Sequence, residues 1–174
     1  LMTWLLSAAV VVMILMTPTL VQKLYAIPAA AALQANSIAT LFLSLGCVVF
    51  GALADRYGAG RVLMAGCAIL GATSMLFYRQ MSSAPQNINE LYALCGFFVG
   101  VIGVVPGVAV KAFPPVVRFS GLSFSYNVAY AVFGGLTPVV VSMLLPLDPL
   151  APAHYVAALS AVGMMIGLYL WRKE

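Results

Sequence analysis

Hydrophobic residues form six long runs separated by short polar connectors. The runs cover residues 3–22, 33–54, 62–78, 91–110, 120–145 and 152–171, and none contains Asp, Glu, Lys or Arg. Each holds roughly 17 to 25 residues, the length that an α-helix needs to cross the hydrocarbon of a bilayer. The alternation of apolar and polar residues that marks a membrane β-barrel is absent. The pattern predicts an all-α membrane protein with six transmembrane helices in one bundle, residues 1–174.

Composition agrees with a membrane protein. The chain is 64% hydrophobic and 7% charged. These are too few charged residues to form the water-exposed surface of a soluble protein, so a soluble enzyme is excluded. The net charge of +4 comes from scattered basic residues, so binding of nucleic acid is not expected. Cys47, Cys67 and Cys95 lie inside apolar runs without metal-site or redox spacing, so we expect them to be packing residues.

Basic residues are unevenly divided between the two sets of connectors. One set, together with the C-terminal end, carries Arg56, Arg61, Lys111, Arg118, Arg172 and Lys173, whereas the other carries Lys23 and Arg79. The positive-inside rule therefore predicts that both ends face the cytoplasm, as in a multi-pass protein of the inner (plasma) membrane. Aromatic residues near the run ends are expected to be interfacial anchors: Trp4, Tyr25, Tyr57, Tyr78, Tyr92, Tyr155 and Trp171.

The connector between the second and third runs carries a motif. It reads Gly51-Ala-Leu-Ala-Asp55-Arg56-Tyr-Gly58-Ala-Gly-Arg61. We expect Asp55 to accept hydrogen bonds from the amides that open the next helix, Gly51 to allow close approach of another helix, and Gly58 to permit a left-handed turn. The alternative is a solvated turn that obeys only the positive-inside rule.

This connector resembles the loop motif of the major facilitator superfamily, G-x-x-x-D-R/K-x-G-R/K-R/K, although Ala59 and Gly60 stand where the pattern has basic residues. In that superfamily the motif lies between the second and third helices of a six-helix half. Its contacts form on one face of the transporter and break when the transporter switches state. The resemblance implies such a gating role for Asp55 and Arg56.

A second stretch, Phe113-Pro-Pro-Val-Val-Arg-Phe-Ser-Gly-Leu-Ser-Phe-Ser-Tyr-Asn127 with Phe133-Gly-Gly-Leu-Thr-Pro138, resembles the entry to the eleventh helix in the metabolite:proton symporter branch. Members of that branch carry proline/betaine, citrate, shikimate and ketoglutarate. The resemblance implies that residues 1–174 are the C-terminal half, helices seven to twelve, of a twelve-span secondary transporter. Its expected partners are the N-terminal half, membrane lipid, a small organic solute and protons.

Polar residues recur at helical spacing in two of the runs. Ser120, Ser123, Asn127, Tyr130, Gly134 and Thr137 share one side of the fifth run, and Asn36, Thr40, Ser44, Cys47 and Gly51 share one side of the second. These rows indicate a shared cavity, although polar residues also join membrane helices. Near Pro18, a freed carbonyl could face solute or the helix could simply kink. The candidates for the solute pathway are Thr17, Asn36, Thr40, Ser123, Tyr126, Asn127, Tyr130 and Thr137.

Three further features are interpreted more simply. Gly96, Gly100, Gly103 and Gly107 predict close helix approach in the fourth run, either as static packing or as a bend used in gating. Lys111 and Arg118 are expected to frame the cytoplasmic mouth, facing lipid phosphates or the other half, or to act only as a topology signal. His154 is expected to be a loop residue.

What the runs lack also limits the function. No ionisable group lies at depth, so a proton-coupling carboxylate is expected in the other half. The sequence has no nucleotide-binding loop, no His/Glu pair for zinc and no plausible Ser/His/Asp set, so no cofactor, no metal and no enzyme activity are expected. Two alternatives remain open: a six-helix carrier or channel that pairs with a second copy of itself, and a noncatalytic membrane scaffold.

Overall fold

The chain folds into six long helical spans, as the hydrophobic pattern predicts. The structure, a computed structural model, describes residues 2–173 and has no strand among them. By length and composition, the six spans suffice to cross a membrane. We number them in chain order: span 1 (Met2–Tyr25), span 2 (Ala29–Tyr57), span 3 (Ala59–Ser83), span 4 (Pro85–Ala112), span 5 (Arg118–Leu144) and span 6 (Ala151–Trp171).

Three spans are regular and three contain a change of helix type. Spans 2, 3 and 6 are the α-helices α3 (Ala29–Tyr57), α4 (Ala59–Ser83) and α9 (Ala151–Trp171). Span 1 consists of α1 (Met2–Val10), the π-helical segment η1 (Val11–Met16) and α2 (Thr17–Tyr25). Span 4 consists of the 3₁₀ turn η2 (Pro85–Asn87), α5 (Ile88–Val99), the 3₁₀ segment η3 (Gly100–Gly103) and α6 (Val104–Ala112). Span 5 consists of α7 (Arg118–Ala129), the π-helical segment η4 (Tyr130–Gly134) and α8 (Gly135–Leu144).

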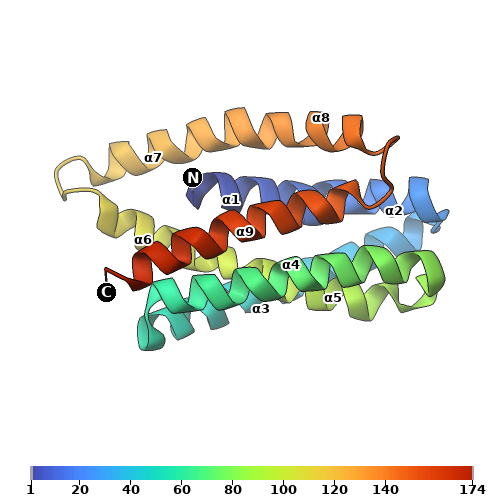
Figure 1. Cartoon of the computed structure of the whole chain (residues 1–174), viewed down its shortest axis with the longest axis horizontal. Helices are drawn as coiled ribbons and strands as arrows, with labels where there is room; N and C mark the ends of the chain where they lie inside the picture. Colours follow the sequence, from blue (N-terminus) through green and yellow to red (C-terminus); the bar gives the residue numbers. More distant parts are fainter. Residues whose placement is uncertain (1, 174) are drawn as a thin grey trace.

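The connectors divide between the two ends of the bundle. The α3–α4 and α6–α7 connectors and the C terminus lie at one end, and the α2–α3, α4–α5 and α8–α9 connectors lie at the other (Figure 1). The first of these ends, here called the basic end, carries the six basic residues that were assigned to one side from the sequence. The fold therefore agrees with the predicted division of charge.

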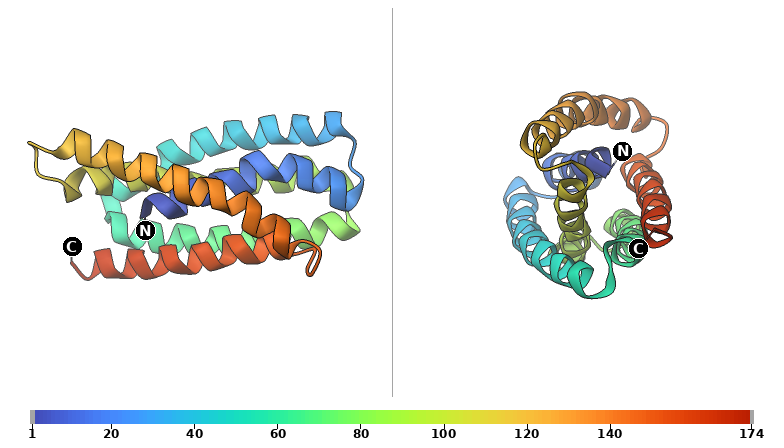
Figure 2. Two further views of the ribbon diagram at one scale, coloured as in Figure 1. Left: turned by 90° about the horizontal axis from the view of Figure 1, so that it is seen from above. Right: turned by 90° about the vertical axis from the view of Figure 1, so that its left-hand side faces the viewer.

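Burial differs strongly between spans. In span 1, 71% of the most apolar window is buried, against 17% in each of spans 2 and 5. The end view in Figure 2 shows span 1 enclosed by its neighbours, with spans 2 and 5 on the outside. The described part of the chain therefore leaves broad faces of spans 2 and 5 uncovered.

Glycines bring two pairs of helices into backbone contact. Gly96 and Gly100 in span 4 face the backbone of α3 at Ala39 and Gly46, as the glycine row predicts. Gly103 faces Cys47 in the same way, but Gly107 has open space around its Cα and takes no part in the contact. In a second close pair, α4 with α9, Gly60 and Gly167 each face the backbone of the other helix, and Gly163 faces the Cys67 side chain. The sequence did not predict this contact. Such small-residue contacts let helices pack tightly in lipid, where the hydrophobic effect does not drive association.

Polar contacts close the α8–α9 connector. Asp148 Oδ1 accepts a hydrogen bond from the Leu150 amide at 2.8 Å, and Asp148 Oδ2 lies 2.6 Å from His154 Nδ1. His154 therefore lies in the first turn of α9, where it pairs with the connector, and is not itself a loop residue.

Candidate functional site

A cluster of buried hydroxyl groups crosses the centre of the bundle. Thr17 Oγ1 donates to the Val12 carbonyl at 2.8 Å and lies 2.9 Å from the Tyr78 hydroxyl. Because the single Thr17 proton is used on Val12, Tyr78 must be the donor of the second bond. From α5, the Tyr92 hydroxyl reaches the Met13 carbonyl. The bonds to Val12 and Met13 satisfy backbone oxygens in the π segment of span 1, as buried polar groups require.

Two tyrosines of this cluster are not the interfacial anchors that the sequence predicts. Tyr78 and Tyr92 were predicted to be interfacial anchors because they lie near run ends, yet both side chains are completely buried. Each hydroxyl reaches inward to a polar group of span 1. The position of a tyrosine along its helix therefore does not show which way its side chain points. Pro18 was a usable signal, since a proline in a helix frees a carbonyl that another residue must satisfy.

A matching arrangement occurs in span 5. Thr137, which also precedes a proline, donates to the Phe133 carbonyl and lies 2.9 Å from the Tyr155 hydroxyl of α9. The sequence row placed Thr137 on the same side as Asn127 and Tyr130, but Thr137 is buried whereas those two are exposed. The π segment η4 explains this difference, because each π turn holds one more residue than an α turn and rotates the residues that follow.

The remaining polar rows lie on the uncovered faces of spans 2 and 5. Thr40 and Ser44 are exposed on α3, and their hydroxyls donate to carbonyls of their own helix. On α7, exposed Asn127 donates to the Ser123 carbonyl at 2.8 Å, and Ser123 is half-buried. Tyr126 is half-buried, with a hydroxyl that has no partner in the described chain. The exposed side chains of Thr40, Ser44 and Asn127 bond only within their own helices, so they are free to meet another molecule, whereas the Tyr126 hydroxyl is buried.

The loop motif lines a cavity of about 860 Å³ at the basic end. Its lining includes Gly51, Asp55, Gly58 and Arg61 from the motif, together with Lys111. Other lining residues come from η3, α6 and the C-terminal end, among them Gly103, Trp171 and Lys173. The structure thus brings one of the two predicted mouth residues next to the motif.

Two expectations for the motif are wrong and one is confirmed. Asp55 does not cap α4, since the helix begins at Ala59 with Gly58 at the N-cap position and has no side-chain cap. A Cβ on Gly51 would meet nothing within 4 Å, so this glycine faces the cavity and no helix approaches it. Gly58 adopts φ 93°, a region that favours glycine, which confirms the predicted turn.

Arg56 and Arg118 lie apart from this cavity lining. The Arg56 guanidinium lies over the Tyr57 ring at 5.4 Å, and both side chains are exposed. Arg118 Nε donates to the Phe113 carbonyl at 3.3 Å, which ties the α6–α7 connector to the start of span 5. The Arg61 guanidinium, within the cavity lining, lies 5.6 Å from the Trp171 ring centre.

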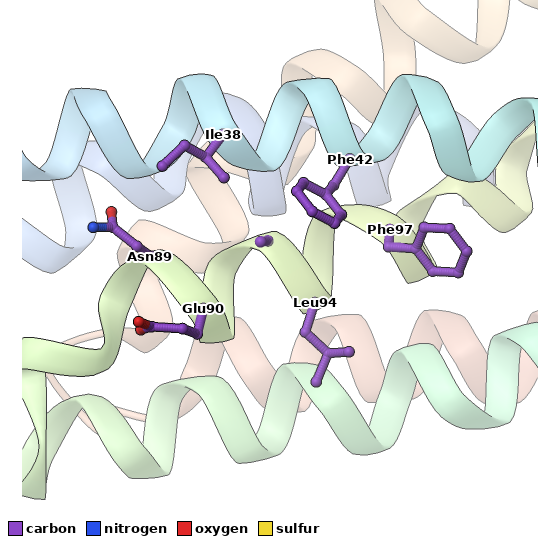
Figure 3. Close-up of a pocket in the computed structure, with 7 residues that line it drawn as sticks. Ile38, Phe42, Asn89, Glu90, Leu94 and Phe97 are labelled. Carbon is purple, nitrogen blue, oxygen red and sulfur yellow. The ribbon is translucent and has the colours of Figure 1, made fainter.

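A second cavity, of about 560 Å³, lies between α3 and α5 near the opposite end. Figure 3 shows its largely apolar lining, which is Ile38, Phe42, Asn89, Glu90, Ala93, Leu94 and Phe97. None of the pathway candidates contributes to it or to the basic-end cavity. The predicted solute pathway therefore does not coincide with either of these two cavities.

Comparison with known proteins identifies relatives among membrane transporters. The chain is 31% identical over 127 residues to a provisionally named proline/betaine transporter of Staphylococcus aureus (strain COL), covering 71% of this chain and 27% of the relative. It is 28% identical over 162 residues to a citrate-proton symporter of Klebsiella pneumoniae, covering 90% and 36%. It is 29% identical over 136 residues to an alpha-ketoglutarate permease of Escherichia coli (strain K12), covering 72% and 30%.

These matches cover most of this chain but only about a third of each relative. No protein-family model matches the chain, and no solved structure matches it significantly. The relatives are members of the major facilitator superfamily, and six apolar helices fit one half of that fold. The chain is therefore a homologue, over part of their length, of the proline/betaine, citrate-proton and ketoglutarate transporters of the major facilitator superfamily.

Proposed function

We propose that the chain forms the C-terminal six-helix half of a secondary active transporter that moves a small organic solute by alternating access. Homology to proline/betaine, citrate-proton and ketoglutarate carriers supports the solute class, and the match to about a third of each relative is consistent with one half of such a protein. Both termini of the segment would face the cytoplasm, at the end that carries six basic residues.

The observation that carries this proposal is the set of polar residues on the uncovered faces of spans 2 and 5. Thr40, Ser44 and Asn127 are exposed, although lipid offers no partners for their polar atoms. A complementary six-helix bundle would cover these faces and leave a water-filled passage between the halves. Asn127 and Tyr130 would then line that passage, together with Thr40 and Ser123.

The basic-end cavity supports a gating role for the loop motif. Within residues 2–173, Asp55 has no salt bridge, although Arg61 and Lys111 line the same cavity. Its carboxylate is therefore available to a group outside the described bundle. Contact with the complementary half in one state, and loss of that contact in the other, would bias the alternating cycle.

Proton coupling would depend on the other half. The charged side chains of residues 2–173 lie at or near the helix ends, and the interior polar groups of these residues are hydroxyls, amides and thiols. A transmembrane proton relay generally uses an ionisable group at depth. This half would accordingly supply hydrogen bonds, shape and a moving wall.

Uptake measurements test the proposal. The polypeptide that the gene encodes is reconstituted in vesicles and supplied with radiolabelled L-proline, glycine betaine, citrate or ketoglutarate, with and without a proton gradient. Asn127→Ala should impair uptake without impairing folding, because its side chain bonds only within its own helix. Ser142→Ala, at another exposed position of span 5, is the matched control. Equal uptake by the two variants would remove Asn127 from the pathway, and no uptake of any of these solutes would contradict the proposed function.

A conformational measurement tests the gate separately. Asp55→Asn should change the reactivity of cysteines introduced on the two faces of the bundle, because it alters the balance between inward-open and outward-open states. Unchanged reactivity on both faces would contradict a gating role. If the chain alone formed a symmetric dimer that transports, the self-associating alternative would replace the half-transporter.

A further inference from the structure

The π segment of span 1 leaves one carbonyl without a donor from its own helix. Helix donors for the Met13 carbonyl would come four or five residues later, from Thr17 or Pro18. The Thr17 amide donates to Val12 instead, and Pro18 has no N–H. Met13 is completely buried, so its carbonyl must be satisfied from another span.

The Tyr92 hydroxyl meets this need but is shared between two groups. It contacts the Met13 carbonyl and also lies 2.7 Å from the side-chain amide atom of α3 that is placed as Asn36 Oδ1. A hydroxyl has one proton and cannot donate to two oxygens at once. Because the Met13 carbonyl can only accept, the proton belongs there, and Asn36 must turn its NH₂ group toward the Tyr92 oxygen. The oxygen and nitrogen of a side-chain amide are assigned from such networks.

This assignment decides which atom Asn36 presents on the uncovered face of span 2. The second heteroatom of its amide has no partner among the described residues and is not enclosed by them. With the nitrogen committed to Tyr92, that atom is the oxygen. One turn along α3, the exposed Thr40 hydroxyl donates its proton to the Asn36 backbone carbonyl at 2.8 Å. Toward any other molecule on this face, Thr40 too can therefore only accept a hydrogen bond.

Resting on the proposed function, we propose that Asn36 and Thr40 form an acceptor site for a solute that carries an N–H donor, namely a protonated primary or secondary amine. Hydrogen bonds that involve a charged group are stronger than neutral ones, so two acceptors one helical turn apart favour such a solute. A quaternary ammonium has no N–H and can donate no hydrogen bond to these oxygens. Asn36 would thereby discriminate between L-proline and its N,N-dimethyl derivative, which share ring and carboxylate.

The experiment measures ligand-induced stabilisation of the purified full polypeptide, read as the rise in thermal-unfolding midpoint with ligand concentration. The probes are L-proline and N,N-dimethyl-L-proline. The wild type should bind L-proline about tenfold more tightly or better. Asn36→Leu should bring the two affinities within about twofold of each other, since leucine offers no acceptor. Ser37→Ala is the control, because that hydroxyl is exposed and bonds only to its own helix at Leu33.

Three results would overturn the inference: equal affinities in the wild type, an unchanged affinity ratio in Asn36→Leu, or no binding of L-proline. The first and third results are measured on the wild type, so the inference can be refuted even if Asn36→Leu misfolds. If one of these three results came together with uptake of citrate or ketoglutarate by the same preparation, the acceptor site would have failed while the proposed function survived. Absence of all uptake would instead remove the proposed function.

Discussion

The contact between spans 2 and 4 depends on glycine, and Gly100→Ala tests it. A Cβ at Gly100 would lie 2.5 Å from the Gly46 carbonyl carbon and 2.6 Å from the Gly46 Cα. All three of its nearest atoms are backbone atoms, so no side chain can turn aside. Ordinary contact begins near 3.4 Å, so the helices must separate by about 0.9 Å.

The expected cost follows from this overlap. Overpacking of a closely packed interior costs about 1–3 kcal/mol, and the better helix propensity of alanine returns up to about 1 kcal/mol. We therefore expect Gly100→Ala to lower the free energy of unfolding by about 1–2 kcal/mol, or the midpoint by about 2–8 °C in a chain of this size. Gly107→Ala is the matched control in the same span, because its Cβ would meet nothing within 4 Å and it should be neutral or stabilising.

Thermal unfolding in detergent, followed by circular dichroism at a helix band, measures both variants against the wild type. If Gly100→Ala were as stable as Gly107→Ala, spans 2 and 4 would not approach at this point, and the close-packing argument would fail.

Three more predictions use the same unfolding assay or simple labelling. Gly58→Ala should destabilise the α3–α4 turn by about 1–3 kcal/mol, because alanine is strained at φ 93°; an unchanged midpoint would mean that the turn relaxes freely. Thr17→Val should cost about 1–3 kcal/mol by removing a buried hydroxyl that bonds two groups, whereas Thr19→Val, at an exposed position two residues on, should cost far less; equal losses would contradict the buried cluster. A maleimide should label Cys47, which is half-buried, faster than Cys67, which is fully buried, and the reverse order would place the helix faces differently.

Prediction from the sequence succeeded where a feature depends on one helix at a time. Span length, connector position and the division of basic residues follow from the cost of placing charges and unpaired backbone in lipid. The glycine row of span 4 also predicted a close contact, because a surface without side chains can approach another backbone. The glycine row could not show that Gly107 lies outside this contact, because that depends on how far along span 4 the helix α3 stays in contact.

Prediction failed where the direction of a side chain depends on a neighbour. The run-end positions of Tyr78 and Tyr92 predict anchors, yet Tyr78 bonds to the Thr17 hydroxyl, and Tyr92 satisfies the Met13 carbonyl that a π segment and a proline leave unpaired. Thr137 turns inward because another π segment adds a residue to the helix before it. The sequence rows assume 3.6 residues per turn, so they cannot reveal the π segments η1 and η4.

The sequence by itself therefore determined that this protein crosses a membrane with six helices and carries its basic charge at one end. The surrounding lipid and water impose those properties on each hydrophobic run and its connectors, whichever helices it packs against. The tertiary structure decided which polar groups are consumed inside the bundle and which remain on the faces of spans 2 and 5. That division depends on hydrogen bonds between helices, and a hydroxyl with one proton can be assigned only when both of its neighbours are known.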